Sequence, residues 1–186
     1  THGSSNFDGS IQSKVSVNAT SGFSIVTYTG TGADDTVGHG LNAEPHVLLN
    51  KRLDGTQSWM MYHKSMGVTE NIVLNSTANK YTSNNWAQTQ PTSSVFSLKT
   101  GTFATNVSGE TYVNYCYAPK VGYSSFGKYT GNGNALGSFT YTGFSPKWVM
   151  IKELGTGGWR IFDSKRPGYN YNNALLANVS DVEESG

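Results

Sequence analysis

Apolar and polar residues follow a period of two along much of the chain, and short apolar runs lie between turns rich in Gly and Asn. Residues 11–17 alternate between apolar and polar side chains, which predicts a half-buried strand. Residues 23–28, 46–51 and 58–63 are rich in β-forming residues and predict further strands. The strongest run, residues 112–119, ends at a proline and predicts a buried strand around which the chain is organised. No stretch has the apolar period of a helix, so the pattern predicts an all-β fold of the β-sandwich or jelly-roll-like kind.

The pattern occurs twice, because residues of the same character return about 101 positions later. Tyr28 begins the sequence Tyr-Thr-Gly-Thr-Gly, and Tyr129 begins the sequence Tyr-Thr-Gly-Asn-Gly. The kept positions are apolar residues, Gly, Pro and Trp, as expected of a repeated core and its turns. Further matches are Pro45 with Pro146, Lys51 with Lys152 and, after a slip of one residue, Trp59–Tyr62 with Trp159–Phe162.

The repeat predicts how the chain is divided into units. We expect a linker over residues 1–10, a first β-sandwich unit over 11–120 and a partial second β-sandwich unit over 121–186. The second unit has no match for residues 95–117, so it is truncated, and either later residues or another chain would complete it. Residues 126–129 are predicted to form a strand that enters a glycine-rich turn.

Composition narrows the classes of function. Charged residues make up 13% of the 186 residues, against roughly 25% in an ordinary soluble domain, and aromatic residues at 12% argue against disorder. The net charge of +1 without a basic run argues against nucleic-acid binding. No apolar stretch reaches the roughly 18 residues that indicate a membrane span, so we expect no membrane insertion. The single cysteine, Cys116, excludes an internal disulfide and is expected to be a buried apolar side chain.

Pairs of adjacent acidic residues are the first candidates for catalysis, because glycosidases need two carboxylates. Asp34 and Asp35 lie in a glycine-rich loop, and Glu183 and Glu184 lie in a polar tail. Adjacent acids in turns are usually solvated, so we expect no catalysis at either pair. The loop oxygens at Asp34 and Asp35 suit a Ca²⁺ ion, but the chain has no Asp-x-Asp-x-Asp-Gly loop, and this alternative stays open.

Histidine and serine residues form no catalytic or metal-binding pattern. Three histidines fall in the first unit without the ligand spacing or the cysteines of a zinc site. No Gly-x-Ser-x-Gly nucleophile elbow occurs. We therefore predict a protein that is not an enzyme and holds no metal and no cofactor. The three histidines are His39, His46 and His63.

Sugar binding is the remaining candidate, because exposed aromatic rings stack on pyranose rings and amide side chains bond their hydroxyls. Tyr81, Asn85 and Trp86 cluster in a long polar loop, where binding residues tend to lie. Tyr169 and Tyr171 form a similar cluster in the second unit. The alternative for Trp86 is that it fills the edge of the sandwich core, because Trp is highly buried on average.

Several long motifs resemble a known family. The sequence from Tyr112 to Gly133, with Tyr-Val-Asn-Tyr-Cys-Tyr-Ala-Pro at its start, resembles a domain of unknown function in virion structural proteins of tailed phages, many of them marine. Phe144–Lys152 and Trp159–Ser164 resemble it too, and the resemblance covers nearly all of residues 11–186. It implies a phage structural protein, often a tail fibre, and it supplies no catalytic residues. The short turn 153–158 departs from the family's longer and more polar one.

We therefore expect a virion structural protein, part of a tail fibre, spike or capsid-surface appendage on the exterior of the particle. Its expected partners are other virion proteins and further copies of itself in a homo-oligomer, with a trimer expected by analogy with phage appendages. It is expected to present a host-binding surface, with a glycan of the host surface as a candidate ligand. The alternative is a carbohydrate-binding module of a secreted or surface protein, which requires an exposed aromatic patch.

Overall fold

The computed structural model describes residues 3–100, 105–166, 173–181 and 184–185, and these residues form fourteen β-strands and no helix. The all-β prediction is therefore confirmed for the described part of the chain. No described helix has the length and apolar character needed to cross a membrane.

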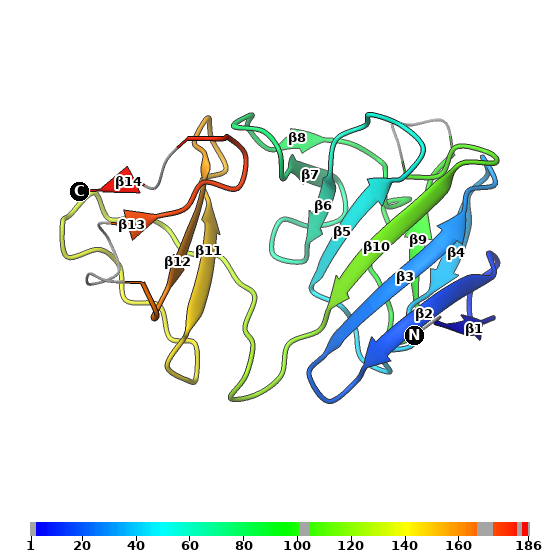
Figure 1. The fold of residues 1–186 in the computed structure, drawn as a ribbon, viewed down its shortest axis with the longest axis horizontal. Coiled ribbons are helices and arrows are strands. Elements are labelled where there is room, and N and C mark those ends of the chain that lie inside the picture. The colour runs from blue at the N-terminus through cyan, green and yellow to red at the C-terminus, as the bar shows by residue number, and fades with distance from the viewer. Residues whose placement is uncertain (1–2, 101–104, 167–172, 182–183, 186) are drawn as a thin grey trace.

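Eight antiparallel strands form one large sheet, which occupies the right half of Figure 1. The chain enters the sheet at one edge, and a strand from much later in the sequence, β10, lies in its middle. This arrangement makes β10 the partner of both β3 and β5. In spatial order the strands are β1 (Ser4–Asn6), β2 (Ser13–Asn18), β3 (Phe23–Thr29), β10 (Thr111–Tyr117), β5 (Val47–Arg52), β6 (Met60–His63), β7 (Glu70–Val73) and β8 (Tyr81–Thr82).

The central strand β10 is the buried strand that the sequence predicts over residues 112–119. Tyr115 lies opposite Ile25 of β3 on one side and opposite Leu49 of β5 on the other. A strand paired on both edges has all of its backbone groups satisfied, and here every second side chain points into the core. Tyr112, Asn114 and Cys116 are fully buried. The buried position of Cys116 is as expected, and burial raises the pKa of its thiol to about 12.

A second, smaller layer completes a sandwich-like arrangement. The strands β4 (Asp35–Gly38) and β9 (Val95–Leu98) pair with each other and lie behind the large sheet in Figure 1. Val37, Phe96 and Leu98 from this pair are fully buried. They pack in one cluster with apolar side chains of the large sheet, so the core lies between the two layers. The sheet side of this cluster includes Val26, Tyr28, Leu48, Tyr62, Tyr112 and Cys116.

The second part of the chain contains a separate hairpin. The strands β11 (Trp148–Lys152) and β12 (Trp159–Asp163) pair with each other, and the short strands β13 (Asn173–Ala174) and β14 (Glu184–Ser185) form another pair. Residues 126–129 do not form the predicted strand, because no ladder partner lies beside them. The chain from residue 125 to residue 147 is irregular.

The hairpin β11–β12 has the same register as the hairpin β5–β6. Val47 lies opposite His63 in the first hairpin, and the matching residues Trp148 and Asp163 lie opposite each other in the second. The next pair inward also corresponds, because Leu48 faces Tyr62 in the first hairpin. The equivalent pair in the second hairpin is Val149 with Phe162. The sequence repeat is thus also a repeat of strand pairing.

The turns of the two hairpins are held by the same contacts. Lys51 donates from Nζ to the backbone carbonyls of Arg52, at 2.7 Å, and Gly55, at 3.0 Å. Lys152 donates in the same way to the carbonyls of Glu153 and Gly155. Because Lys51 and Lys152 are one repeat apart, their shared role explains why lysine is kept in both copies.

A contact between the start of the second strand and the residues beyond it is repeated as well. The Oδ1 atom of Asn75 accepts a hydrogen bond from the Trp59 amide at 3.0 Å. Asn178 accepts one from the Trp159 amide at 2.8 Å. Asn75 therefore holds the chain that follows β7 against the residue before β6, and Asn178 holds the chain near the C-terminus against the start of β12. The division into units over 11–120 and 121–186 stays a prediction, but β5, β6 and the residues after β6 have a structural copy.

Candidate functional site

The predicted sugar-binding loop is corrected at two of its residues, Trp86 and Asn85. Trp86 is 1% exposed, and its indole Nε1 donates to Oδ1 of Asn71 at 2.7 Å. Its ring packs edge-on against Tyr62 with 6.0 Å between centroids. Asn85 is buried beside it. The ring of Trp86 is therefore part of the core, as in the alternative interpretation, and its faces are covered by protein.

Tyr81 is the described residue of this prediction that reaches the surface, with 38% of its area exposed. It lies in β8, the edge strand of the large sheet, and its hydroxyl donates to Sδ of Met60 at 3.3 Å. Tyr169 and Tyr171 lie outside the described residues. The predicted stacking cluster therefore reduces to a single exposed ring on the described part of the chain.

A row of aromatic rings that the sequence analysis did not single out lies on the outer face of the large sheet. Phe23 of β3 stacks with Tyr115 of β10 at 6.2 Å between centroids and 6° between planes. Tyr115 continues the row to Trp59, just before β6, at 6.1 Å and 21°. Tyr117 joins it at 4.9 Å from Phe23. All four rings are partly exposed, so the row offers near-parallel aromatic surface across the middle of the sheet.

The sequence contains a signal for this row in the alternation within β10. Residues that share one face of a strand are two apart. Tyr115 and Tyr117 alternate with the buried Asn114 and Cys116 and must therefore point away from the core. The large apolar side chains of the run predict burial along its whole length, whereas the structure buries one face and leaves Tyr115 and Tyr117 on the other. Tyrosine combines a flat apolar ring with a polar hydroxyl, which suits a surface that binds ring-shaped polar ligands.

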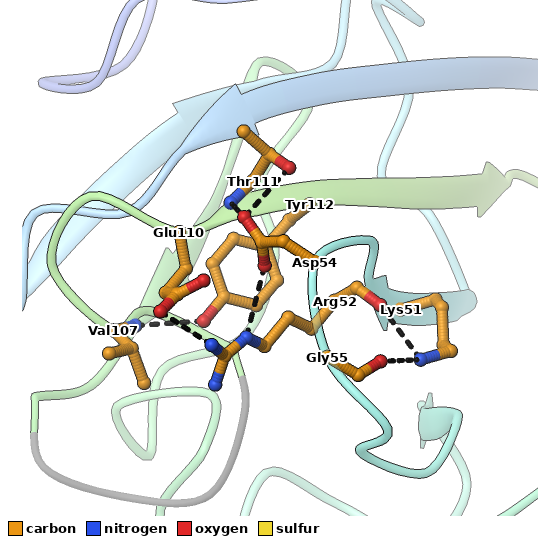
Figure 2. A network of polar contacts seen from close by, with 8 residues as sticks. All are labelled: Lys51, Arg52, Asp54, Gly55, Val107, Glu110, Thr111 and Tyr112. Carbon is orange, nitrogen blue, oxygen red and sulfur yellow. Dashed lines mark hydrogen bonds and ion pairs between the residues drawn. The ribbon is translucent and has the colours of Figure 1, made fainter.

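A charged network links the turn after β5 to the start of β10 (Figure 2). The carboxylate of Asp54 accepts hydrogen bonds from the Thr111 amide at 2.7 Å and from the Thr111 hydroxyl at 3.0 Å. Arg52 donates from Nε to Asp54 at 3.0 Å and pairs through Nη2 with Glu110 at 2.5 Å. The hydrogen bond from the Thr111 amide is the largest cause that holds the pKa of Asp54 well below its ordinary value, and the Arg52 guanidinium adds to it.

This network anchors the fold and has the wrong electrostatics for acid–base catalysis. A catalytic carboxyl group needs a pKa near the working pH, whereas the pKa of Asp54 is lowered and its oxygens are already bonded. Arg52 is likewise engaged by two carboxylates, and Asp54 raises its pKa. The network therefore fixes the turn of β5–β6 to the central strand.

The acidic pair in the glycine-rich loop is bonded to donors from the same chain. Asp34 accepts from the Lys99 ammonium group and, at 3.0 Å, from the Thr100 amide, and the bond to Lys99 lowers the pKa of Asp34. Asp35 accepts from the Ser10 hydroxyl at 2.7 Å. Across the described residues, no three His, Cys, Asp or Glu side chains gather as metal ligands would.

The three histidines lie apart from any catalytic arrangement. His39 is buried, its Nε2 donates to the Thr92 carbonyl at 3.2 Å, and its Nδ1 accepts from the Leu41 amide at 3.2 Å. Burial lowers the pKa of His39 and of His63, and the second of these also bonds Ser65 through Nδ1. Burial also lowers the pKa of His46. The rings of His39 and His63 thus bond residues two positions later in the chain, Leu41 and Ser65.

The fold and contacts define an all-β, sandwich-like domain whose most prominent surface feature is an aromatic row on a sheet face. All of residues 1–186 match the family DUF7483, described as a domain of unknown function, and the chain belongs to this family. No curated protein and no solved structure matches the chain. The description of this family agrees with the resemblance of the sequence motifs to a domain of unknown function.

Proposed function

We propose that this protein is a structural module of a tailed-phage virion, part of a tail fibre, spike or capsid-surface appendage on the outside of the particle. The observation that carries the proposal is the direct contact between two copies of one strand motif. Trp159, at the start of β12, is buried and donates from Nε1 to the Val73 carbonyl of β7 at 3.0 Å. The Lys80 amide also donates to the Leu154 carbonyl at 3.0 Å. Repeated β-units that touch along one chain suit an elongated, stiff appendage.

The composition and the contacts support the same class. Charged residues are few, at 13%, and the charged network at Asp54 serves to hold strands together. Strand edges in such a module are covered by neighbouring proteins or by further copies of the chain. The proposed partners are therefore other virion proteins and a homo-oligomer, for which a trimer is the form expected by analogy with phage appendages.

The aromatic row is the proposed host-binding surface. Phe23, Tyr115 and Trp59 present three near-parallel rings that are partly exposed. A host-surface glycan is the proposed ligand, because sugar rings stack on such surfaces. If the row binds glycan, Trp59→Ala will lower binding in a glycan array, while Tyr81→Ala at the sheet edge will leave it unchanged.

Labelling of virus particles tests the proposal. Antibodies raised against the whole chain are applied to intact particles of a phage that encodes it, and the bound gold is located by electron microscopy. We expect gold on an external appendage and peptides of the chain in the mass spectrum of purified particles. Particles that carry neither label nor peptides would show that the protein is not part of the virion.

The aromatic row also favours a second candidate, a carbohydrate-binding module of a secreted or surface protein. The two functions differ in where the protein is found and not in whether the row binds sugar. A carbohydrate-binding module would bind free polysaccharide through Trp59 and be absent from purified particles. Glycan binding together with labelled particles would favour the appendage.

A further inference from the structure

One edge of β11 is open, whereas the equivalent strand of the first unit is paired on both sides. β5 pairs with β6 on one side and with the central strand β10 on the other. Its copy β11 pairs with β12, and within the described residues no strand lies along its second edge. The free edge of β11 is the one that β10 occupies on β5, because β12 matches β6 in register. An open edge exposes unpaired backbone donors and acceptors.

Apolar side chains beside this edge are exposed, although their equivalents in the first unit are buried. Trp148 is 57% exposed, and its equivalent Val47 is 4% exposed. Val149 is 37% exposed, and its equivalent Leu48 is fully buried. In the first unit, Val47 and Leu48 lie opposite residues of β10. The apolar side chains of β11 are therefore exposed at positions where those of β5 are buried.

The segment before β11 is also left uncovered. Tyr129 is 53% exposed, whereas its equivalent Tyr28 in β3 is 4% exposed and donates to the Thr105 carbonyl at 2.6 Å. A Cβ atom added to Gly30 would lie 2.3 Å from the Val107 carbonyl oxygen, but one added to the equivalent Gly131 would meet nothing within 4 Å. Three more large apolar residues of this segment, Leu136, Phe139 and Tyr141, are exposed.

The second unit has no match for residues 95–117, which include β9 and β10, and the free edge of β11 corresponds to the absent β10. In the first unit β10 lies between β3 and β5, so it pairs with both and covers their apolar side chains. The second unit contains the equivalents of β3 and β5 in its sequence, but only the equivalent of β5 is a strand. The equivalent of β3 stays irregular because its ladder partner would be a strand like β10. Exposed large apolar side chains in such number beside an open strand edge favour an interaction site.

We propose that the second unit is an acceptor site for an extended peptide with the residue pattern of β10. The peptide adds to β11 as an antiparallel strand, which is the strand-addition mode of peptide recognition. The first unit supplies the register: Cys116 lies opposite Leu48 and Tyr117 opposite Val47. The bound peptide therefore places its equivalents of Cys116 and Tyr117 opposite Val149 and Trp148. Residues 126–129 then pair with its other edge, as β3 pairs with β10.

One position of the peptide is predicted to differ from β10. Asn114 of β10 lies opposite Asn50 of β5, and Asn50 donates from Nδ2 to the Tyr28 hydroxyl at 2.9 Å. In β11 the equivalent of Asn50 is Ile151, which offers no polar group. Within β10 the Asn114 amide donates to Sγ of Cys116 at 3.1 Å, so in a peptide without that cysteine an amide opposite Ile151 would lack a partner, and such a group costs free energy. We therefore expect an apolar residue at that position of the peptide.

The probe for the test is a synthetic peptide of residues 110–118 with Cys116→Val and a terminal fluorescent label. Its binding to the whole 186-residue chain is measured by fluorescence anisotropy. We expect saturable binding, and a peptide that also carries Asn114→Val will bind roughly tenfold tighter. Hydrogen exchange will show new protection of the β11 amides and of residues 126–129. A peptide of the same composition in scrambled order should not bind.

Two variants of the chain locate the site. Val149→Asp places a charge on the acceptor strand and should weaken peptide binding at least tenfold, whereas Val179→Asp, at an exposed position away from β11, should not. Equal binding of the ordered and scrambled peptides, or protection that avoids β11, would overturn the inference. So would a dimer of the chain in light scattering that Val149→Asp abolishes, because the edge would then be covered by a second copy. The inference is independent of the proposed virion function, since the peptide test requires no virus particle.

Discussion

Replacing Trp86 by Ala distinguishes a core residue from a surface ligand-binding residue. The side chain is 1% exposed, contacts Tyr62 and donates to Asn71. Truncation of a buried aromatic residue to Ala costs about 3–5 kcal/mol, because transfer free energy is lost and a cavity remains. The Oδ1 atom of Asn71 also loses its donor, which places the expected loss in the upper half of that range.

Urea unfolding followed by far-ultraviolet circular dichroism measures the effect. With an m-value of about 1.5 kcal/mol/M, a loss of about 4 kcal/mol lowers the urea midpoint by about 2–3 M. Trp86→Phe keeps most of the ring but removes the indole donor, so its loss should be smaller, about 1–3 kcal/mol. Tyr81→Ala, at an exposed edge position, serves as the control and should cost less than about 1 kcal/mol. A Trp86→Ala variant as stable as Tyr81→Ala would refute the placement of Trp86 in the core.

Three further predictions follow from individual contacts. Gly30→Ala should destabilise the fold by about 1–3 kcal/mol, because its Cβ would meet the Val107 carbonyl at 2.3 Å. Gly131→Ala should have a stability within about 0.5 kcal/mol of the parent protein in the same urea assay. Equal effects of the two substitutions would contradict the difference in packing. Asp54→Asn should destabilise the protein at pH 7, because a carboxyl group with a lowered folded-state pKa stabilises the fold while it is ionised. The difference in melting temperature between the variant and the parent should therefore shrink as the pH falls below about 4. Thermal melts from pH 7 to pH 2 measure this difference, and a constant value would rule the prediction out. Cys116, whose thiol pKa is raised to about 12 by burial, should not react with a thiol reagent at pH 8 in the folded state and should react fully in urea; rapid reaction of the folded protein would show that the thiol is accessible.

The central strand was predictable because residues 112–117 are rich in β-forming residues and lie between turn signals. Its period of two also places Tyr115 and Tyr117 on the face opposite Asn114 and Cys116. The order of the sheet was not predictable in the same way. Nothing local in β10 indicates that it lies between β3 and β5, which are more than fifty residues earlier in the sequence.

Residues 126–129 show why a local pattern does not suffice for a strand. They belong to a sequence that matches β3, including the Tyr-Thr-Gly-x-Gly turn that follows, yet they form no ladder. A strand is stabilised by its hydrogen-bonded neighbours, and the neighbour of β3 is β10. Equivalent positions of the repeat can therefore form a strand in one unit and be irregular in the other, according to whether a strand like β10 lies beside them.

The aromatic residues that the sequence analysis singles out are not the ones exposed on the sheet. Trp86 in the polar loop is buried and contacts Asn71 and Tyr62, from two strands that precede it. The exposed rings lie instead on the outer sheet face at Phe23, Tyr115 and Trp59. Only the order β3, β10, β5, β6 across the sheet brings these three rings together.

Hydrogen exchange of the free chain tests most directly the central claim that the second unit lacks the strand that β10 supplies to the first. The amides of β3, β10 and β5 lie in continuous ladders, and we expect them to exchange slowly. Residues 126–129, which match β3 in sequence but have no ladder, should exchange at rates close to those of an unfolded peptide. Slow exchange over residues 126–129, equal to that of β3, would contradict the account, because it would show that the second unit already has its missing partner.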